Sequence, residues 1–262
     1  MSDRKQRITR AFSDSVDYYA EHGRLQKQVA ERLGRSLEPW QHSVPDGPVI
    51  EVGAGTGFFS TYLTRLYSHR SVILTDISRQ MIDRCRSEFN GNENIDYKVL
   101  DAETAEWPDS TYALIAGNFV AQWFKDPSAT LSEMMGSLKP GGLMLMSFPG
   151  NESFPQWKKY CLELGLPYTG IDLPDVEQLV VNLSMGPVKV DFYEDQSSDT
   201  FKDVYEFFRH LKKTGTSVST AKRKLTPRQL RLLNNYWLEQ NNGKVTVHYH
   251  TAFIAAKRDL NS

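Results

Sequence analysis

Residues 49–57 read VIEVGAGTG, so an apolar, strand-like run passes directly into three glycines at alternate positions. Gly53, Gly55 and Gly57 let the backbone turn tightly and bring its N–H groups close to a ligand, because no Cβ stands in the way. A segment typical of a helix follows at once. This order of strand, glycine-rich turn and helix predicts a nucleotide-binding loop.

The residues beside this loop narrow the kind of ligand. A dinucleotide-binding G-x-G-x-x-G motif would place its third glycine at position 58, where this chain has Phe58. Pyrophosphate binding is therefore disfavoured. Glu51, an acidic residue just before the loop, also disfavours an anion and favours a cationic ligand such as S-adenosylmethionine.

Strand-like and helix-like segments alternate through the first 150 residues, after a helical pattern over residues 8–38. The predicted strands of this part are residues 48–53, 71–76, 95–100, 111–117 and 143–148. Alternation of this kind predicts an α/β fold in which parallel strands are joined by right-handed crossovers. A ligand of such a doubly wound sheet lies across the carboxyl ends of the strands, which is where the glycine loop stands.

The pattern changes after residue 150. Two more strand patterns, residues 187–194 and 245–256, enclose two helical segments, which we interpret as a helical cap inserted before the last strand. We therefore expect three parts. They are an N-terminal helical segment over the active site (residues 1–44), a cofactor-binding core (residues 45–150), and a segment that completes the sheet and carries the cap (residues 151–262).

The composition excludes several classes of protein. A formal net charge of −1 over 262 residues indicates neither nucleic acid nor a membrane surface as a partner, and we expect a monomer. The charged N-terminus lacks the apolar run of a signal peptide, so a cytoplasmic location is expected. Cys85 and Cys161 stand far apart, and His248 and His250 have no acidic companion in the sequence, so no redox motif and no metal site is predicted.

One local charge pattern stands out from this neutral background. Residues 207–238 contain eight Lys or Arg residues and no Asp or Glu. Such a run is either a solvated face or a docking surface for an acidic partner, and composition leaves both interpretations open.

Carboxylates follow two of the predicted strands. Asp76 ends the strand 71–76, where an aspartate can accept hydrogen bonds from both hydroxyls of an adenosine ribose. Asp101, Ala102 and Glu103 follow the next strand, where a carboxylate and the neighbouring backbone N–H can recognise the amino edge of adenine. Alone, an aspartate at a strand end is more often a helix cap or a turn residue, but together with the glycine loop the two sets predict an adenosine site.

The segment after the strand 111–117 reads NFVAQW, residues 118–123. A polar residue at this strand end should face the methyl donor and the reacting group. Phe119 and Trp123 are interpreted as wall of the pocket, and Gln122 is open to either a structural or a chemical role.

At these positions the chain resembles the class I S-adenosylmethionine-dependent methyltransferases, over residues 45–150. The matching features are the loop 49–57, Asp76, Met81, residues 101–103 and the turn 140–142. From end to end it also resembles a narrower family, the malonyl-acyl-carrier-protein O-methyltransferases of biotin synthesis. That likeness rests on residues 11–13, 19, 25–26, 118, 122–123, 207–208, 211–216 and 249–253.

The resemblance implies a Rossmann-like, mostly parallel sheet of seven strands and methyl transfer from S-adenosylmethionine to the free carboxylate of malonyl-acyl-carrier protein or malonyl-CoA. The products are S-adenosylhomocysteine and a malonyl methyl ester that primes pimeloyl formation. The implied cofactor-binding residues are Gln26, Glu51, Gly53, Ala54, Gly55, Gly57, Asp76, Ile77, Met81, Asp101, Ala102, Glu103 and Asn118. Family members commonly have Cys where this chain has Ala54, which matters little because the backbone makes the contact.

A carboxylate substrate is already ionised at neutral pH, so the implied reaction needs no general base and depends on positioning. We assign positioning to Tyr19, Gln122 and Lys212, and substrate contacts to Tyr19, Trp123 and Lys212. Docking of the acidic carrier protein is assigned to Lys222, Arg223 and Lys224. Tyr19 is chosen over Tyr18 because it keeps the family's spacing to Gln26. The alternatives are another small-molecule methyltransferase, acting on a quinone precursor or a free carboxylic acid, and a non-catalytic S-adenosylmethionine-binding protein.

Overall fold

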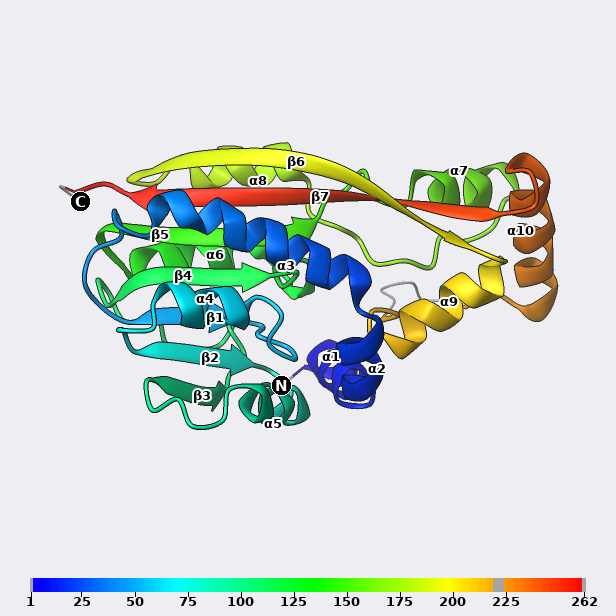
Figure 1. Ribbon diagram of the computed structural model, residues 1–262. Helices are drawn as coiled ribbons and strands as arrows, with labels where there is room; N and C mark the ends of the chain where they lie inside the picture. Colours follow the sequence, from blue (N-terminus) through cyan, green and yellow to red (C-terminus); the bar gives the residue numbers. More distant parts are fainter. Residues whose placement is uncertain (1, 219–223, 261–262) are drawn as a thin grey trace.

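The centre of the computed structural model, which describes residues 2–218 and 224–260, is one seven-stranded sheet in the order β3-β2-β1-β4-β5-β7-β6 (Figure 1). All neighbours are parallel except β7, which is antiparallel to both β5 and β6. The strands are β1 (Val49–Val52), β2 (Val72–Asp76), β3 (Ile95–Val99), β4 (Tyr112–Asn118), β5 (Leu138–Pro149), β6 (Val188–Phe201) and β7 (Val245–Arg258). The doubly wound, mostly parallel sheet of seven strands is thus confirmed.

The strand order reverses between β1 and β4, which lie side by side although β2 and β3 separate them in sequence. In an open α/β sheet such a switch point opens a crevice at the carboxyl ends of the strands. The glycine loop follows β1 and therefore lies at the edge of this crevice.

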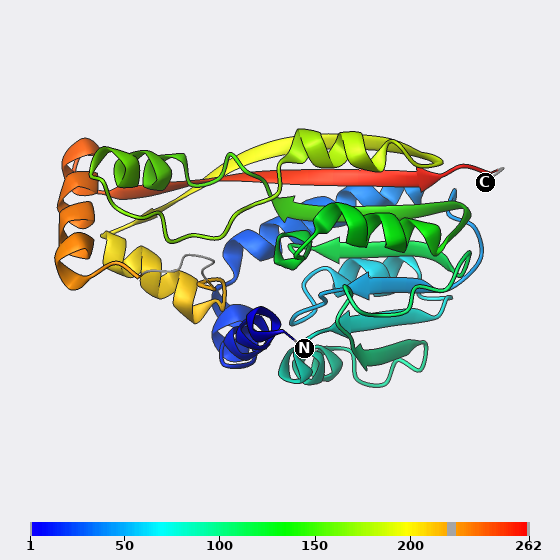
Figure 2. The ribbon, with the colours of Figure 1, turned by 180° about the vertical axis from the view of Figure 1, so that it is seen from behind.

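Helices cover both faces of the sheet (Figures 1 and 2). On one face α3, α4 and α5 bury apolar side chains such as Leu33 and Leu63 against the central strands. On the other face α6 and α8 do the same with Met134 and Leu179. Their bounds are α3 (Arg24–Leu37), α4 (Ser60–Leu66), α5 (Arg79–Glu88), α6 (Pro127–Gly136) and α8 (Val176–Leu183).

The N-terminal segment differs from the single helix expected over residues 8–38. It consists of α1 (Asp3–Ser13), α2 (Val16–His22) and then α3. The break before α3 is at Gly23, whose φ of −72° and ψ of 54° are not helical. A Cβ at Gly23 would lie 2.7 Å from the carbonyl oxygen of Tyr19, so only glycine permits this turn.

The last two strands form an arm that extends beyond the sheet. β6 and β7 pair over their full length, from Val188 with Arg258 to Phe201 with Val245, but β5 pairs only with the second half of β7. The free end of this arm carries the cap, which is built from α7 (Pro155–Glu163), α9 (Val204–Lys213) and α10 (Pro227–Gln240) around Phe207 and Trp237 (Figure 1).

β6 ends seven residues later than the sequence pattern indicates, at Phe201 rather than Glu194. The added residues, 195–201, are mostly polar and half exposed, and their composition is unlike that of a typical strand. Backbone pairing with β7 keeps them extended, which a local pattern does not reveal. Within the part of the chain that the structure covers, no helix has the length and apolar character needed to cross a membrane.

Candidate functional site

The glycine loop has the conformation that its composition predicts. Gly53, Gly55 and Gly57 have φ values of +69°, +56° and +98°, all in the left-handed region. A Cβ at Gly53 would lie 2.8 Å from Cγ2 of Val120, so the loop after β1 packs closely on the loop after β4. The Ala54 N–H donates to the carbonyl oxygen of Thr75 at 2.8 Å and ties the turn to β2.

Asp76 joins the end of β2 to this loop. Its Oδ2 accepts from the Gly55 N–H at 2.9 Å and its Oδ1 accepts from the Ser78 N–H at 2.8 Å. Burial raises the pKa of Asp76 to about 6, although the backbone hydrogen bonds oppose the shift. The carboxylate also lines the cavity beside the loop. The two backbone N–H groups fix its orientation there.

Glu51 lies in β1 and is 1% exposed. Its Oε2 accepts from the Ser60 hydroxyl at 2.6 Å, whereas Oε1 is buried and has no hydrogen-bond partner among the described residues. Burial raises the pKa of Glu51 to about 8. A buried carboxyl oxygen without a hydrogen-bond partner is costly, and a cation bound nearby, such as a sulfonium or ammonium group, would favour the ionised form of Glu51.

The carboxylates after β3 are engaged by a residue that the sequence analysis did not select. Lys5 of α1 pairs with Oδ1 of Asp101 at 2.8 Å and also with Glu103. The Glu103 N–H donates to the same Asp101 oxygen at 3.2 Å. The adenine end of the expected site is therefore closed by the N-terminal helix.

The loop after β4 is held by an unusual backbone. Phe119 has a φ of +53°, a conformation that costs energy for a residue with a side chain and often marks a functional site. Asn118 donates from Nδ2 to the Gln26 carbonyl oxygen at 3.1 Å, and Gln122 donates from Nε2 to the Phe119 carbonyl oxygen at 2.7 Å. Oε1 of Gln122 is buried without a partner among the described residues.

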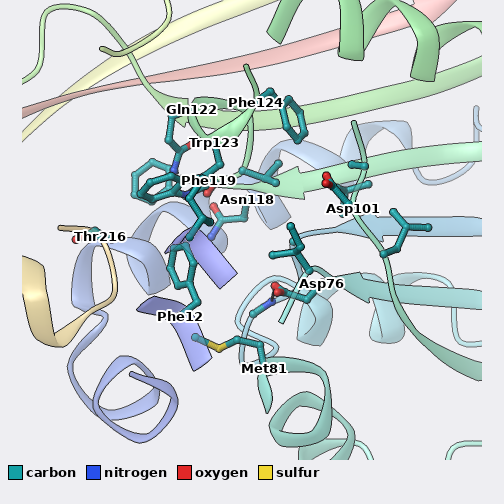
Figure 3. Close-up of a pocket in the computed structure, with 18 of the residues that line it drawn as sticks. Phe12, Asp76, Met81, Asp101, Asn118, Phe119, Gln122, Trp123, Phe124 and Thr216 are labelled. Atoms are coloured by element: carbon teal, nitrogen blue, oxygen red, sulfur yellow. Dashed lines mark hydrogen bonds between the residues drawn. The ribbon is translucent and has the colours of Figure 1, made fainter. Parts of the chain in front are cut away.

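These elements enclose a cavity at the carboxyl ends of β1, β2, β3 and β4 (Figure 3). Twelve of the predicted site residues line it: Tyr19, Gln26, Gly53, Gly55, Asp76, Ile77, Met81, Asp101, Ala102, Asn118, Gln122 and Trp123. Four others, Glu51, Ala54, Gly57 and Glu103, are not among the residues that line it. We call this space the cofactor cavity.

A second, larger cavity of about 510 Å³ adjoins it on the side of the cap. The two cavities share Gln26, Phe119, Gln122, Trp123 and Thr216. The wall of the second cavity is largely apolar; Trp157 and Phe208 come from the cap and Tyr249 from β7. Arg7, Lys212 and Lys224 bring positive charge to it. We call it the acceptor cavity.

Tyr19 and Tyr18 face different surroundings. Tyr19 stacks on Phe58 with ring centroids 5.5 Å apart and lines the cofactor cavity, but it does not line the acceptor cavity. Tyr18 instead packs against His22 and lies under the ammonium group of Lys213. The geometry thus brings Tyr19, and not Tyr18, to the predicted site. Its substrate contact remains a prediction.

Two of the residues selected for docking, Lys222 and Arg223, fall outside the described residues. His248 contacts Oε1 of Gln156 at 2.9 Å and His250 contacts Oε1 of Glu194 at 2.8 Å. In the described parts of the chain, no three histidine, cysteine or acidic residues gather where they could hold a metal ion.

The sequence analysis missed the contribution of α1. Lys5, Ile8 and Phe12 all line the cofactor cavity, and Arg7 lines the acceptor cavity. The spacing of Lys5, Ile8 and Phe12 places them on one face of a helix, which is a signal that could have been read. What the sequence does not indicate is that this face turns toward the strand ends.

Comparisons with known proteins agree with this geometry. Residues 50–146 match the family described as a methyltransferase domain. The malonyl-[acyl-carrier protein] O-methyltransferase of Magnetococcus marinus is 28% identical over 257 residues, covering 96% of this chain and 92% of the relative. The protein of the same name from Halalkalibacterium halodurans is 25% identical over 244 residues, covering 89% and 90%. The solved structure of the YcgJ protein from Bacillus subtilis superposes with a TM-score of 0.61 at 15% identity, covering 87% of this chain and 97% of that one.

The chain is a class I S-adenosylmethionine-dependent methyltransferase. This follows from the match to a methyltransferase domain, the strand order of the sheet, and the glycine loop with carboxylates at the strand ends. The cofactor suits the residues present, because the unpaired Glu51 oxygen favours a cation and Asp76 lies beside the glycine loop where a ribose can be bound. Within this class the chain is similar to malonyl-[acyl-carrier protein] O-methyltransferases, and the similarity runs through nearly the whole length of both chains.

The close approach at Gly53 yields a first prediction. Gly53→Ala should destabilise the protein by more than the ~1–2 kcal/mol that a left-handed alanine costs, because its Cβ would collide with Val120. It should also weaken S-adenosylhomocysteine binding at least ~10-fold, since the loop must shift. Gly91→Ala is the matched control: its φ is +85°, but nothing lies within 4 Å of the added Cβ. Equal losses of binding in the two variants, measured by calorimetry, would contradict the prediction.

Proposed function

We propose that this protein transfers a methyl group from S-adenosylmethionine to the free carboxylate of malonyl-acyl-carrier protein. Its relatives are named as enzymes with this activity. The observation that carries the proposal is the pair of adjoining cavities. An apolar acceptor cavity with cationic side chains borders the methyl-donor site and shares with it residues of the loop after β4. A small carboxylate carried on a long, flexible thioester arm fits this combination.

The site residues supply alignment rather than acid–base chemistry. A malonyl carboxylate is ionised at neutral pH and needs no residue to remove a proton. The bound cofactor supplies an electrophilic methyl group on its sulfonium sulfur. Phe119, Gln122 and Trp123 border both cavities, so they set the line along which the acceptor oxygen approaches and exclude water from it.

We assign the carboxylate contact to Lys212, a residue of α9 in the wall of the acceptor cavity. Arg7 of α1 and Lys224 provide further positive charge in the same wall. A cation holds the carboxylate, whereas the methyl ester that forms is neutral and loses this attraction. Loss of charge on methylation therefore favours release of the product.

The basic segment of the cap is assigned to the acidic carrier protein. Of the residues selected for docking, Lys224 is described and lies in the wall of the acceptor cavity. Residues 207–238 include most of α9 and of α10, and described residues among them, such as Phe208, Lys212 and Leu225, line the cap side of that cavity. Complementary charge raises the rate of encounter with an acidic partner and makes that rate depend on ionic strength.

The role of Lys212 can be tested with a neighbouring lysine as its control. Lys212→Met should raise KM for malonyl-thioester ~10- to 100-fold, because it removes a charge-assisted hydrogen bond to the carboxylate. Affinity for S-adenosylhomocysteine should stay unchanged. Lys213→Met removes the same charge from the same helix, but Lys213 lies over the ring of Tyr18 and outside the acceptor cavity, so KM should stay near the wild-type value. Steady-state kinetics with both variants decides the assignment, and equal effects would refute it.

The activity itself is tested by mass spectrometry. Purified protein is incubated with S-adenosylmethionine and malonyl-acyl-carrier protein, and the acyl group is expected to gain the mass of one methylene. Mild hydrolysis of the ester should restore malonate. Transfer to a free carboxylic acid or a quinone precursor, without transfer to malonyl-thioester, would instead support another small-molecule methyltransferase. Binding of the cofactor without transfer to any acceptor would support a non-catalytic protein.

A further inference from the structure

Helix α1 spans the carboxyl edge of the sheet and is attached at three places. Near its start, Arg4 donates to the Trp123 carbonyl oxygen at 2.7 Å and Lys5 pairs with Asp101 and Glu103. At its end, the Ser13 hydroxyl lies 2.9 Å from that of Ser78, the residue that caps α5. In Figures 1 and 2, α1 and α2 lie between the strand ends and the cap.

Among these attachments, the contact of Lys5 is an ion pair, and its side chains are largely buried. The side chains of Lys5, Asp101 and Glu103 are only 10%, 15% and 12% exposed. Two carboxylates share one ammonium group, which also lies 5.7 Å from the centre of the Phe124 ring. Removing the ammonium group would leave two neighbouring carboxylates with the same charge in a poorly solvated place.

With α1 in this position the cofactor cavity has a volume of only about 80 Å³. Cavities that hold ligands of this size are typically ~300–1,000 Å³. Lys5, Ile8 and Phe12 form one wall of the cavity, and Phe12 also packs edge-on against Trp123. The space left is smaller than a nucleoside needs, and α1 is the wall that is held to the strand ends by side-chain contacts.

We propose that Lys5 is a positioning residue that latches α1 over the cofactor cavity and thereby sets the rate of cofactor exchange. The inference rests on the proposed cofactor site and on no property of the acceptor. S-adenosylmethionine enters and S-adenosylhomocysteine leaves when the ion pairs from Lys5 to Asp101 and Glu103 are broken. The latch acts on the empty site through both carboxylates, and on the occupied site through Glu103, which is not among the residues that line the cofactor cavity.

This arrangement predicts a particular kinetic pattern. A weaker latch raises the fraction of open protein, so association becomes faster. The same change speeds dissociation, because release also passes through the open state. The two rate constants rise together and the dissociation constant changes little. A residue that merely contacts the ligand shows a different pattern, in which dissociation speeds up and affinity falls.

The test is stopped-flow binding of S-adenosylhomocysteine, followed by the fluorescence of Trp123 and the other tryptophans. For Lys5→Met we expect both rate constants to rise ~10- to 100-fold, as for loss of a hydrogen bond to a charged group. Lys5→Arg keeps the charge and should restore most of the wild-type rates. Arg10→Met is the matched control on the same helix, because Arg10 is 85% exposed and pairs only loosely with Asp14, at 3.8 Å.

Each outcome is decisive. A parallel rise in both rate constants, together with faster amide hydrogen exchange of α1 in the empty protein, supports the latch. Faster dissociation with unchanged association overturns it and makes Lys5 a simple contact. Unchanged rates, or equal changes in Arg10→Met, also overturn it. Failure of the wild-type protein to bind S-adenosylhomocysteine at all would instead refute the proposed cofactor site.

Discussion

Asp76→Ala should weaken S-adenosylhomocysteine binding by a factor of about 10² to 10⁴. The proposed ribose contact consists of two hydrogen bonds to an ionised carboxylate, each contributing ~1.5–3 kcal/mol. Asp76 also accepts the Gly55 N–H at 2.9 Å, so its loss loosens the glycine loop that the cofactor approaches. Isothermal titration calorimetry measures the loss directly.

Two controls separate the ribose contact from the effect on the loop. Asp83→Ala removes an aspartate of α5 whose side chain is 52% exposed, and it should leave binding unchanged. An analogue of S-adenosylhomocysteine that lacks both ribose hydroxyls should bind the wild-type protein weakly and lose little more affinity in Asp76→Ala. If the analogue loses as much as the natural ligand does, Asp76 acts through the loop alone.

Glu51→Gln should change stability and cofactor affinity in opposite directions. In the folded protein without cofactor, burial raises the pKa of Glu51 to about 8, against a value of 4.5 for an ordinary glutamate. Between these two values the folded state holds a proton that the unfolded chain has released. The stability of the wild-type protein therefore falls as pH rises from about 4.5 to about 8, by an amount on the order of 5 kcal/mol. A glutamine at position 51 does not ionise in this pH range, so it removes this loss of stability.

We therefore expect Glu51→Gln to match the wild type in its free energy of unfolding near pH 5 and to exceed it by several kcal/mol near pH 8. Urea denaturation at both pH values measures this difference. A Glu51→Gln variant whose stability declines with pH as steeply as that of the wild type would show that another group is responsible. Asp76, whose pKa is raised to about 6, contributes a similar decline at lower pH, and both proteins share it.

The affinity of the same variant for S-adenosylmethionine should fall ~10-fold or more, because a buried negative charge near the cationic ligand is lost. The wild-type protein should release up to one proton on binding at pH 7.5, since a cation favours the ionised form of Glu51. Calorimetry in buffers of different ionisation enthalpy counts this proton. Proton release that persists in Glu51→Gln would assign it elsewhere.

Much of the fold and of the cofactor site could be read from short stretches of the chain. The loop 49–57, Asp76 and the residues after β3 are each recognised within a few consecutive positions. The topology of a parallel sheet then brings strand ends together without further information. For this reason twelve of the selected residues line one cavity. The exact end of β6 and the break at Gly23 were not predictable in this way, because backbone pairing and close packing decide them.

The sequence by itself determined the class of fold, the glycine loop and the nature of the cofactor, since these depend on neighbouring residues and on strand order. Only the tertiary structure decided how the site is closed and what adjoins it. Lys5 meets Asp101 across 96 positions of the chain, and the acceptor cavity is assembled from α1, the loop after β4 and the cap on the β6–β7 arm. Such contacts arise from the packing of distant segments, for which no local pattern of residues exists.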